Sequence, residues 1–350
     1  MFKLFPTKTP SCGLDLGSSW CKMTKLARKG KDLALERFGR LPWSGQKPGD
    51  FSLKGKKIKD LWTHLALKDK IIVSSLAGHA VIVKRVFIKA PKDNKIEQYI
   101  IQQAEQYIPF DVKDVHLDYH ILDQDGHDGN NLEVILVASK IKVVQELTQV
   151  MDYSGLNLNI VDVDSFALSN CFEFNYPELT QDPAYLLDIG GRQSIFVVFW
   201  RNQPLFFREM SFGGRQLTEA IAKIAEVGTG EAERIKLQGT DTLRGEEKER
   251  IYQSCEELLR SWSREIKRMA GFYQTSVKGA KQAEILFLSG GGSMFSGIRQ
   301  VLEDELNIET RHLDPWKNIH IKHNDFDLKY LEAVKPQFAV STGLALRGFI

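Results

Sequence analysis

Cysteine pairs and long apolar runs are both missing from this chain of 350 residues. Its four cysteines, Cys12, Cys21, Cys171 and Cys255, are scattered and form no CxxC pair. This spacing excludes a disulfide framework and a cysteine zinc site, and it is typical of a reducing compartment. No stretch reaches the roughly 18 apolar residues of a membrane span, and the first ten residues lack the apolar core of a signal peptide. We therefore expect a soluble, cytoplasmic protein.

Charge is unevenly distributed, although the net charge is only +2. Residues 1–90 carry 19 Lys and Arg against 6 Asp and Glu, whereas the remainder carries 28 against 39. A basic N-terminal quarter suits an anionic lipid surface or an acidic partner, and a solvated basic face is the simpler explanation. Because no aromatic stacking pattern accompanies the basic residues, we do not expect nucleic-acid binding.

Strand-like and helical segments alternate along the chain, which is typical of layered α/β folds. Between residues 85 and 153 their order, strand-helix-strand-strand-helix, predicts a compact inserted unit with a turn at 123–131 (DQDGHDGNN). We expect strands at 71–75, 81–88, 117–122, 132–138, 158–163, 184–188, 194–200 and 285–288. We expect helices at 95–107, 141–153, 214–238 and 245–276.

One motif occurs twice: an apolar strand, an aspartate, a glycine turn and a second strand. Glycine turns let backbone N–H groups approach an anion, and an aspartate at a strand end can hold hydrated Mg²⁺. Two such turns facing each other predict a polyphosphate site. The candidate residues are Asp15, Gly17, Ser18, Ser19 and Lys22 in the first copy and Asp188, Gly190 and Gly191 in the second.

Two further glycine-rich elements each precede a predicted helix, where bare backbone and the helix dipole suit a flat, anionic ligand. Close packing alone would also explain the glycines. In the first of these helices Glu219 is a candidate ligand-binding residue, although an ion pair between Glu219 and Lys223 is the simpler explanation. The glycines are Gly213 and Gly214 in one element and Gly290, Gly291 and Gly292 in the other.

The order of these elements resembles the phosphate-1, connecting, phosphate-2 and adenosine signature of the actin-like ATPase superfamily. The strings that carry the likeness are DLGSSWCK, DVDSFAL, DIGG, FGGRQLTEAIA, LSGGGSMFSGI and STGLALRGFI. Within the superfamily, AEQYIPFDVKDVHLDYHIL, REMSFGGRQLTEAIA and the terminal GLALRGF are most similar to the PilM family of type IV pilus assembly. The likeness covers nearly the whole chain.

The resemblance implies an α/β fold of the actin-like (ribonuclease H-like) type, with two lobes, a duplicated core and an inserted subdomain like that of FtsA. It places the first lobe at 1–84 and 154–183, and the inserted, partner-binding subdomain at 85–153. The second lobe is expected at 184–345, with a helical part at about 214–278, and residues 346–350 form the C-terminal end.

The resemblance also implies a cytoplasmic, ATP-binding scaffold of the pilus assembly platform, peripheral to the inner membrane. Members of the family bind the cytoplasmic N-terminal tail of a PilN-like membrane protein in a groove that involves the inserted subdomain. PilO- and PilP-like proteins and the pilus motor ATPases are the indirect partners, and a homo-oligomer is compatible with this role. The nucleotide-binding roles pass to all the candidate residues above, with Asp15 and Asp188 holding Mg²⁺ through water.

Two departures from the superfamily pattern bear on catalysis. Asp164, the one candidate catalytic residue, stands where the pattern has Glu, and its shorter side chain would place water differently. Arg192 and Gln193 follow the second glycine turn in place of a small Thr or Ser. We therefore expect at most a weak ATPase. A small-molecule kinase using Asp162 or Asp164 as base, and a filament-forming FtsA-like protein, are the alternatives. We do not expect the C-terminal amphipathic helix by which FtsA-like proteins hold the membrane.

Overall fold

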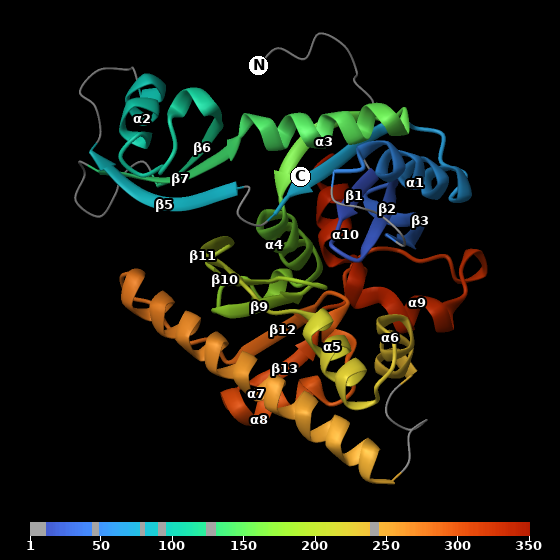
Figure 1. Cartoon of the computed structure of the whole chain (residues 1–350). Helices are drawn as coiled ribbons and strands as arrows, with labels where there is room; N and C mark the ends of the chain where they lie inside the picture. Colours follow the sequence, from blue (N-terminus) through green and yellow to red (C-terminus); the bar gives the residue numbers. More distant parts are fainter. Residues whose placement is uncertain (1–11, 44–48, 78–80, 90–95, 124–130, 239–244) are drawn as a thin grey trace.

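Two five-stranded sheets of the same design form the centre of the computed structural model (Figure 1). The structure describes residues 12–43, 49–77, 81–89, 96–123, 131–238 and 245–350. In each sheet three antiparallel strands are followed by two parallel ones, so the order β3-β2-β1-β4-β8 corresponds to β11-β10-β9-β12-β13. The first sheet contains β1 (Cys12–Leu16), β2 (Trp20–Lys29), β3 (Asp32–Pro42), β4 (Ile71–Leu76) and β8 (Asn157–Val163). The second contains β9 (Ala184–Ile189), β10 (Ser194–Trp200), β11 (Gln203–Met210), β12 (Ile285–Ser289) and β13 (Glu309–His312).

Helices α4 (Asp164–Asn175) and α10 (Ala339–Leu346) lie between the two sheets (Figure 1). Phe172 of α4 is fully buried against the second sheet. The helices approach each other so closely that a Cβ at Gly343 would lie 1.7 Å from the backbone oxygen of Ala167. Glycine is therefore required at position 343, and α10 packs against β1 and α4 although it belongs to the segment expected in the second lobe.

The opposite faces of the two sheets are covered by helices with apolar stripes. Helices α1 and α3 bury Leu61 and Val150 against the first sheet, and α5, α7 and α8 bury Leu217 and Trp262 against the second. The segment expected as one helix at 214–238 is two helices, because Glu226 between them adopts a φ of 52°. The helices are α1 (Phe51–His64), α3 (Ile141–Ser154), α5 (Gly214–Ile224), α6 (Thr229–Gln238), α7 (Gly245–Ser276), α8 (Ile298–Leu306) and α9 (Leu328–Val334).

A third sheet, of order β5-β7-β6, stands apart from the two central sheets (Figure 1). It consists of β5 (Val81–Lys89), β6 (Val115–Asp123) and β7 (Asn131–Lys140), and α2 (Ile96–Ala104) packs on one face. Helix α3, also within the segment 85–153, packs instead on α1 of the first lobe. The turn expected at 123–131 falls, apart from its two ends, outside the described residues.

The four cysteines are buried and free. Burial raises the pKa of Cys12 to about 12 and those of Cys21 and Cys255 to about 11, so their thiols stay protonated at neutral pH. In the part of the chain that the structure describes, no helix combines the length and apolarity needed to cross a bilayer.

Candidate functional site

The two glycine turns predicted to hold phosphate lie against each other between the sheets. A Cβ built on Gly191 would lie 2.4 Å from Ser19 Oγ and 2.7 Å from Ser18 Oγ. The hydroxyls of the first turn therefore contact the bare backbone of the second. The structure thus brings together the two copies of the motif, which are 173 residues apart in the sequence.

The other two glycine elements meet at the second turn. A Cβ on Gly213 would lie 2.8 Å from Gly190 O, one on Gly292 would lie 3.2 Å from the same oxygen, and one on Gly214 would lie 3.3 Å from Gly292 Cα. Gly290 has a φ of 83°, which favours glycine. Loops from distant parts of the chain thus pack together through bare backbone. Gly213, Gly214, Gly290 and Gly292 are buried in this contact, whereas Gly291 is exposed.

The start of α5 is tied to the second turn. The backbone N–H of Gly214 donates to Gly190 O at 2.9 Å, and that of Arg215 donates to Gly191 O at 2.8 Å. These amides fix the turn and are already paired within the protein. Glu219 is exposed and accepts a hydrogen bond from Arg215 Nε at 2.8 Å, so its ion-pair partner is Arg215 and not Lys223.

A single ammonium group, that of Lys22, lies among three aspartates. It donates a hydrogen bond to Asp15 across the β1–β2 pair, and the charges of Asp188 and Asp164 also act on it. Burial lowers the pKa of Lys22, but the attraction of Asp15 and then of Asp188 outweighs it, so the pKa is raised. The ammonium therefore stays charged, and one positive charge faces three carboxylates.

The other two aspartates are held by serines at the ends of parallel strands. Ser75 donates to Asp164, and Ser289 Oγ donates to Asp188 Oδ1 at 2.7 Å. Burial, and then the negative charge of Asp15, raise the pKa of Asp164; burial also raises that of Asp188. Excess negative charge at this point favours binding of a cation or a proton.

The carboxylates suit a magnesium ion that retains water. Mg²⁺ in nucleotide sites takes one or two carboxylates, phosphate oxygens and several waters. Among the described residues no group of three or more His, Cys, Asp or Glu side chains has the geometry of an all-protein metal site. Asp15 and Asp188 therefore fit Mg²⁺ only together with a phosphate ligand.

Besides Ser75 and Ser289, two further contributors to the site were missed by the sequence reasoning. Lys236 on α6 donates to Gly214 O at 3.1 Å, to Thr218 Oγ1 at 2.9 Å and to Glu233 at 2.6 Å, which fixes the start of α5. Trp43 Nε1 donates to Gly17 O at 2.6 Å, which fixes the first turn. Neither belongs to a glycine motif; the only sequence signal for the lysine is its i, i+3 spacing from Glu233.

Asp162, the other candidate base, lies away from this cluster of carboxylates. It forms an ion pair with Arg347, whose Nε is 3.0 Å from Asp162 Oδ2. The contact joins the end of β8 to the C-terminal end of α10 and gives Asp162 a structural partner.

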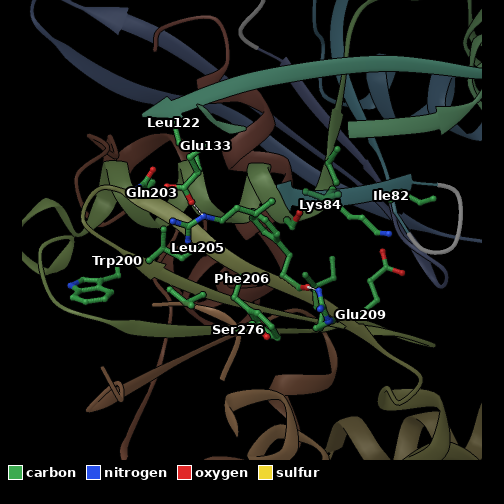
Figure 2. A pocket seen from close by; sticks show the side chains of 18 of the residues that line it. Ile82, Lys84, Leu122, Glu133, Trp200, Gln203, Leu205, Phe206, Glu209 and Ser276 are labelled. Atoms are coloured by element: carbon green, nitrogen blue, oxygen red, sulfur yellow. Dashed lines mark hydrogen bonds and ion pairs between the residues drawn. The ribbon is translucent and has the colours of Figure 1, made fainter. Parts of the chain in front are cut away.

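A cavity of about 970 Å³ lies between the three-stranded sheet and the second lobe (Figure 2). Its walls come from β5, from β11 and from the C-terminal end of α7. Asp164 and its neighbours Val163 and Ser165 also line it. The first turn of α4 therefore borders both the cavity and the cluster of carboxylates.

The repeated sheet, with glycine turns facing each other across the interface, defines the actin-like class of two-lobed α/β proteins. Two solved structures under 25% identical share this fold. EutJ of Carboxydothermus hydrogenoformans has a TM-score of 0.55 at 13% identity and covers 98% of this chain and 91% of its own. ADP-bound MreB5 of Spiroplasma citri has a TM-score of 0.51 at 13% identity, with coverages of 95% and 94%.

Within that class, the model of the family "Type IV pilus assembly protein PilM" matches residues 13–349. The chain therefore belongs to this family. A chain of the solved PilM-PilN type IV pilus biogenesis complex is 25% identical, with a TM-score of 0.86, and the match covers 98% of this chain and 100% of that one. The expected fold and family are both confirmed.

Proposed function

We propose that this protein is a nucleotide-bound scaffold of type IV pilus assembly. ATP lies between the two sheets, and the tail of a PilN-like membrane protein lies in the cavity beside them. Contact between the two glycine turns at Gly191, Ser18 and Ser19 is the observation that carries the nucleotide site. Membership in the pilus assembly family supports the biological setting.

Each part of the nucleotide has a candidate binding group. Amides of residues 17–19 and of Gly191 donate to phosphate oxygens, while the amide of Gly190 already donates to Gln193 O at 3.0 Å. Lys22 neutralises negative charge. Asp188 and Asp15 hold Mg²⁺ through water. The surface around Gly213, Gly214 and Gly290–Gly292 accepts the adenosine. Mg²⁺, when bound, offsets charge on the phosphates and on the aspartates.

The protein holds ATP longer than an efficient ATPase would. Asp164, the candidate catalytic residue, accepts a hydrogen bond from Ser75 and has a raised pKa. A raised pKa by itself suits a general base, but the side chain is one methylene shorter than Glu and is held by the serine, so it is less well placed to activate water. We therefore assign Asp164 mainly to the electrostatics of the site.

The partner is the cytoplasmic N-terminal tail of a PilN-like protein. The solved relative at 98% coverage of this chain is a PilM-PilN complex. The cavity borders the three-stranded sheet of the inserted subdomain, to which the family resemblance assigns partner binding. Attachment to the inner membrane then depends on that partner. PilO- and PilP-like proteins and the motor ATPases are reached indirectly.

Nucleotide and tail affect each other through the first turn of α4, which borders both sites. Coupling of this kind changes affinities by about 5- to 150-fold. We expect ATP with Mg²⁺ to tighten tail binding by about tenfold, measured by fluorescence anisotropy with and without nucleotide. Equal affinities in both conditions would remove the coupling and leave the two sites in place.

The nucleotide assignment is tested by titration calorimetry of ATP and Mg²⁺ into Asp15→Ala and Asp188→Ala. We expect Asp188→Ala to lose detectable binding and Asp15→Ala to bind about tenfold more weakly, while both remain folded by circular dichroism. Undiminished binding in both would overturn the site. The same preparations address the two alternatives: a kinase releases ADP only with an added small substrate, and a filament former pellets with ATP.

A further inference from the structure

The cavity holds a buried polar atom with no partner. Arg85 on β5 pairs through Nε with Glu133 on β7, and the two side chains are 19% and 12% exposed. Arg85 Nη1 is buried and, among the described residues, has no hydrogen-bond partner. An unpaired buried donor is costly, so this nitrogen marks a place where a ligand can contribute an acceptor.

The charge and polarity around Arg85 determine which hydrogen-bond acceptor of a ligand fits beside it. Glu133 already balances the charge of the guanidinium, and Figure 2 shows the apolar Leu122 and Leu205 in the same part of the cavity. A carboxylate added here would bring uncompensated negative charge into a buried place. A neutral carbonyl oxygen pairs with Nη1 without that cost.

The strands that line the cavity favour an extended ligand. β5 is an edge strand of the three-stranded sheet, and β11 is an edge strand of the second sheet. Edge strands carry unpaired backbone N–H and C=O groups. An extended peptide can pair with such an edge while it presents carbonyl oxygens to nearby donors.

Exposed basic residues complete the lining. Lys84, Arg201, Arg208 and Lys278 lie at the solvent-exposed parts of the cavity, and cation–ring contacts hold Arg201 on Trp200 and Arg208 on Phe206. These four cations outnumber the exposed Glu209 in the lining, so acidic side chains of a ligand fit at these positions and not beside Arg85. The exposed part of the cavity therefore favours acidic groups of a ligand, and the buried part around Arg85 favours neutral ones.

We propose that Arg85 determines the specificity of the tail site by donating from Nη1 to a neutral carbonyl oxygen of an extended peptide. The oxygen belongs either to the peptide backbone or to an Asn or Gln side chain. This inference rests on the proposed function, because it takes the cavity as the tail site. It adds the chemical class that the site recognises.

The test uses a fluorescein-labelled synthetic peptide with the first 25 residues of the PilN-like protein encoded in the same genome. Anisotropy titrations compare wild type with Arg85→Gln, with the double variant Arg85→Gln/Glu133→Gln, which leaves no carboxylate unpaired, and with the matched control Arg299→Gln on α8. We expect both Arg85 variants to bind at least tenfold more weakly, and the control to match wild type. Thermal melts confirm that each variant is folded.

A second set of peptides identifies the oxygen. If it is an amide side chain, replacing one Asn or Gln by Ala weakens binding to wild type tenfold and leaves binding to Arg85→Gln unchanged. Changing that residue to Asp also weakens binding to wild type, and Glu133→Gln restores it. If no single side chain has this effect, the acceptor is a backbone carbonyl.

Two results distinguish a failure of the role of Arg85 from a failure of the partner assignment. A peptide that binds wild type and folded Arg85 variants equally, or whose Arg85-dependent residue is Asp or Glu, overturns the role of Arg85 alone. A peptide that does not bind wild type overturns the partner assignment itself.

Discussion

The two central sheets repeat one design and differ at the cross-strand neighbour of the aspartate. In the first sheet Asp15 lies opposite Lys22, whereas in the second Asp188 lies opposite Ile195. The first hairpin therefore supplies its own counter-charge. The second depends on Ser289 and on the lysine of the other lobe. Asp15 is therefore paired with a cation of its own hairpin, whereas Asp188 is not.

The sheets also differ in which aspartate is bound by the serine near the end of β4 or of β12. Ser289 bonds to Asp188 on the adjacent strand, but Ser75 reaches Asp164 at the start of α4. In the first lobe this hydrogen bond links β4 to α4, the helix whose first turn also borders the cavity. The duplicated core is therefore asymmetric: of the two serines, Ser75 is the one that binds a residue lining the cavity.

The largest effect is expected from removing the counter-charge of the first hairpin. Lys22→Met leaves Asp15, which is 5% exposed, without its ammonium partner. An unpaired buried charge costs about 3–5 kcal/mol of unfolding free energy, measurable by urea unfolding at pH 7.5. Asp15→Asn added to Lys22→Met should restore most of the loss.

The matched control lies in the second hairpin, where Ile195→Val should cost only about 1 kcal/mol. Equal losses for Lys22→Met and Ile195→Val would contradict the asymmetry.

The next largest effect concerns Mg²⁺. Asp188→Asn should weaken ATP binding about 100-fold, or about 2.7 kcal/mol, and remove most of its dependence on Mg²⁺. Asp15→Asn should weaken it less, by about tenfold, because Lys22 remains to attract phosphate. Calorimetric titrations with Mg²⁺ and with EDTA measure both quantities. The reverse order of effects would show that the first hairpin carries the metal.

Asp164→Asn should stabilise the nucleotide-free protein. The raised pKa of Asp164 means that the folded state binds the proton more tightly than the unfolded state, so the wild type loses stability as pH rises through that pKa. At pH 8 the variant should therefore melt at a higher temperature than the wild type. The gain should shrink as the pH falls. A lower melting temperature at pH 8 would contradict the account.

The smallest effect is expected at Glu219. Its ion pair with Arg215 is exposed, so Glu219→Ala should change stability by less than about 0.5 kcal/mol and ATP affinity by less than about twofold. Lys236→Met should weaken ATP binding about tenfold, because Lys236 fixes Gly214 at the start of α5. A strong loss of ATP binding in Glu219→Ala would show that Glu219 takes part in nucleotide binding.

The sequence was informative where local chemistry determines structure. The repeated Asp-Gly turns marked Asp15, Asp188 and the facing glycines, because close backbone approach requires glycine wherever it occurs. It gave no sign of Ser75 and Ser289, since the role of each serine depends on strand register between distant segments.

The sequence also did not predict how distant segments pack together. The placement of α10 between the sheets depends on tertiary contacts such as that of Gly343 with Ala167. The ion pair between Arg85 and Glu133 depends on the pairing of β5 with β7, which periodicity alone does not specify.

The most direct test of the account is a crystal structure of the protein with AMPPNP and Mn²⁺, whose anomalous signal locates the metal. The account predicts the phosphates between the turns at residues 17–19 and 190–191, with Mn²⁺ near Asp188. Nucleotide found elsewhere, for example in the cavity between β5 and β11, would contradict it.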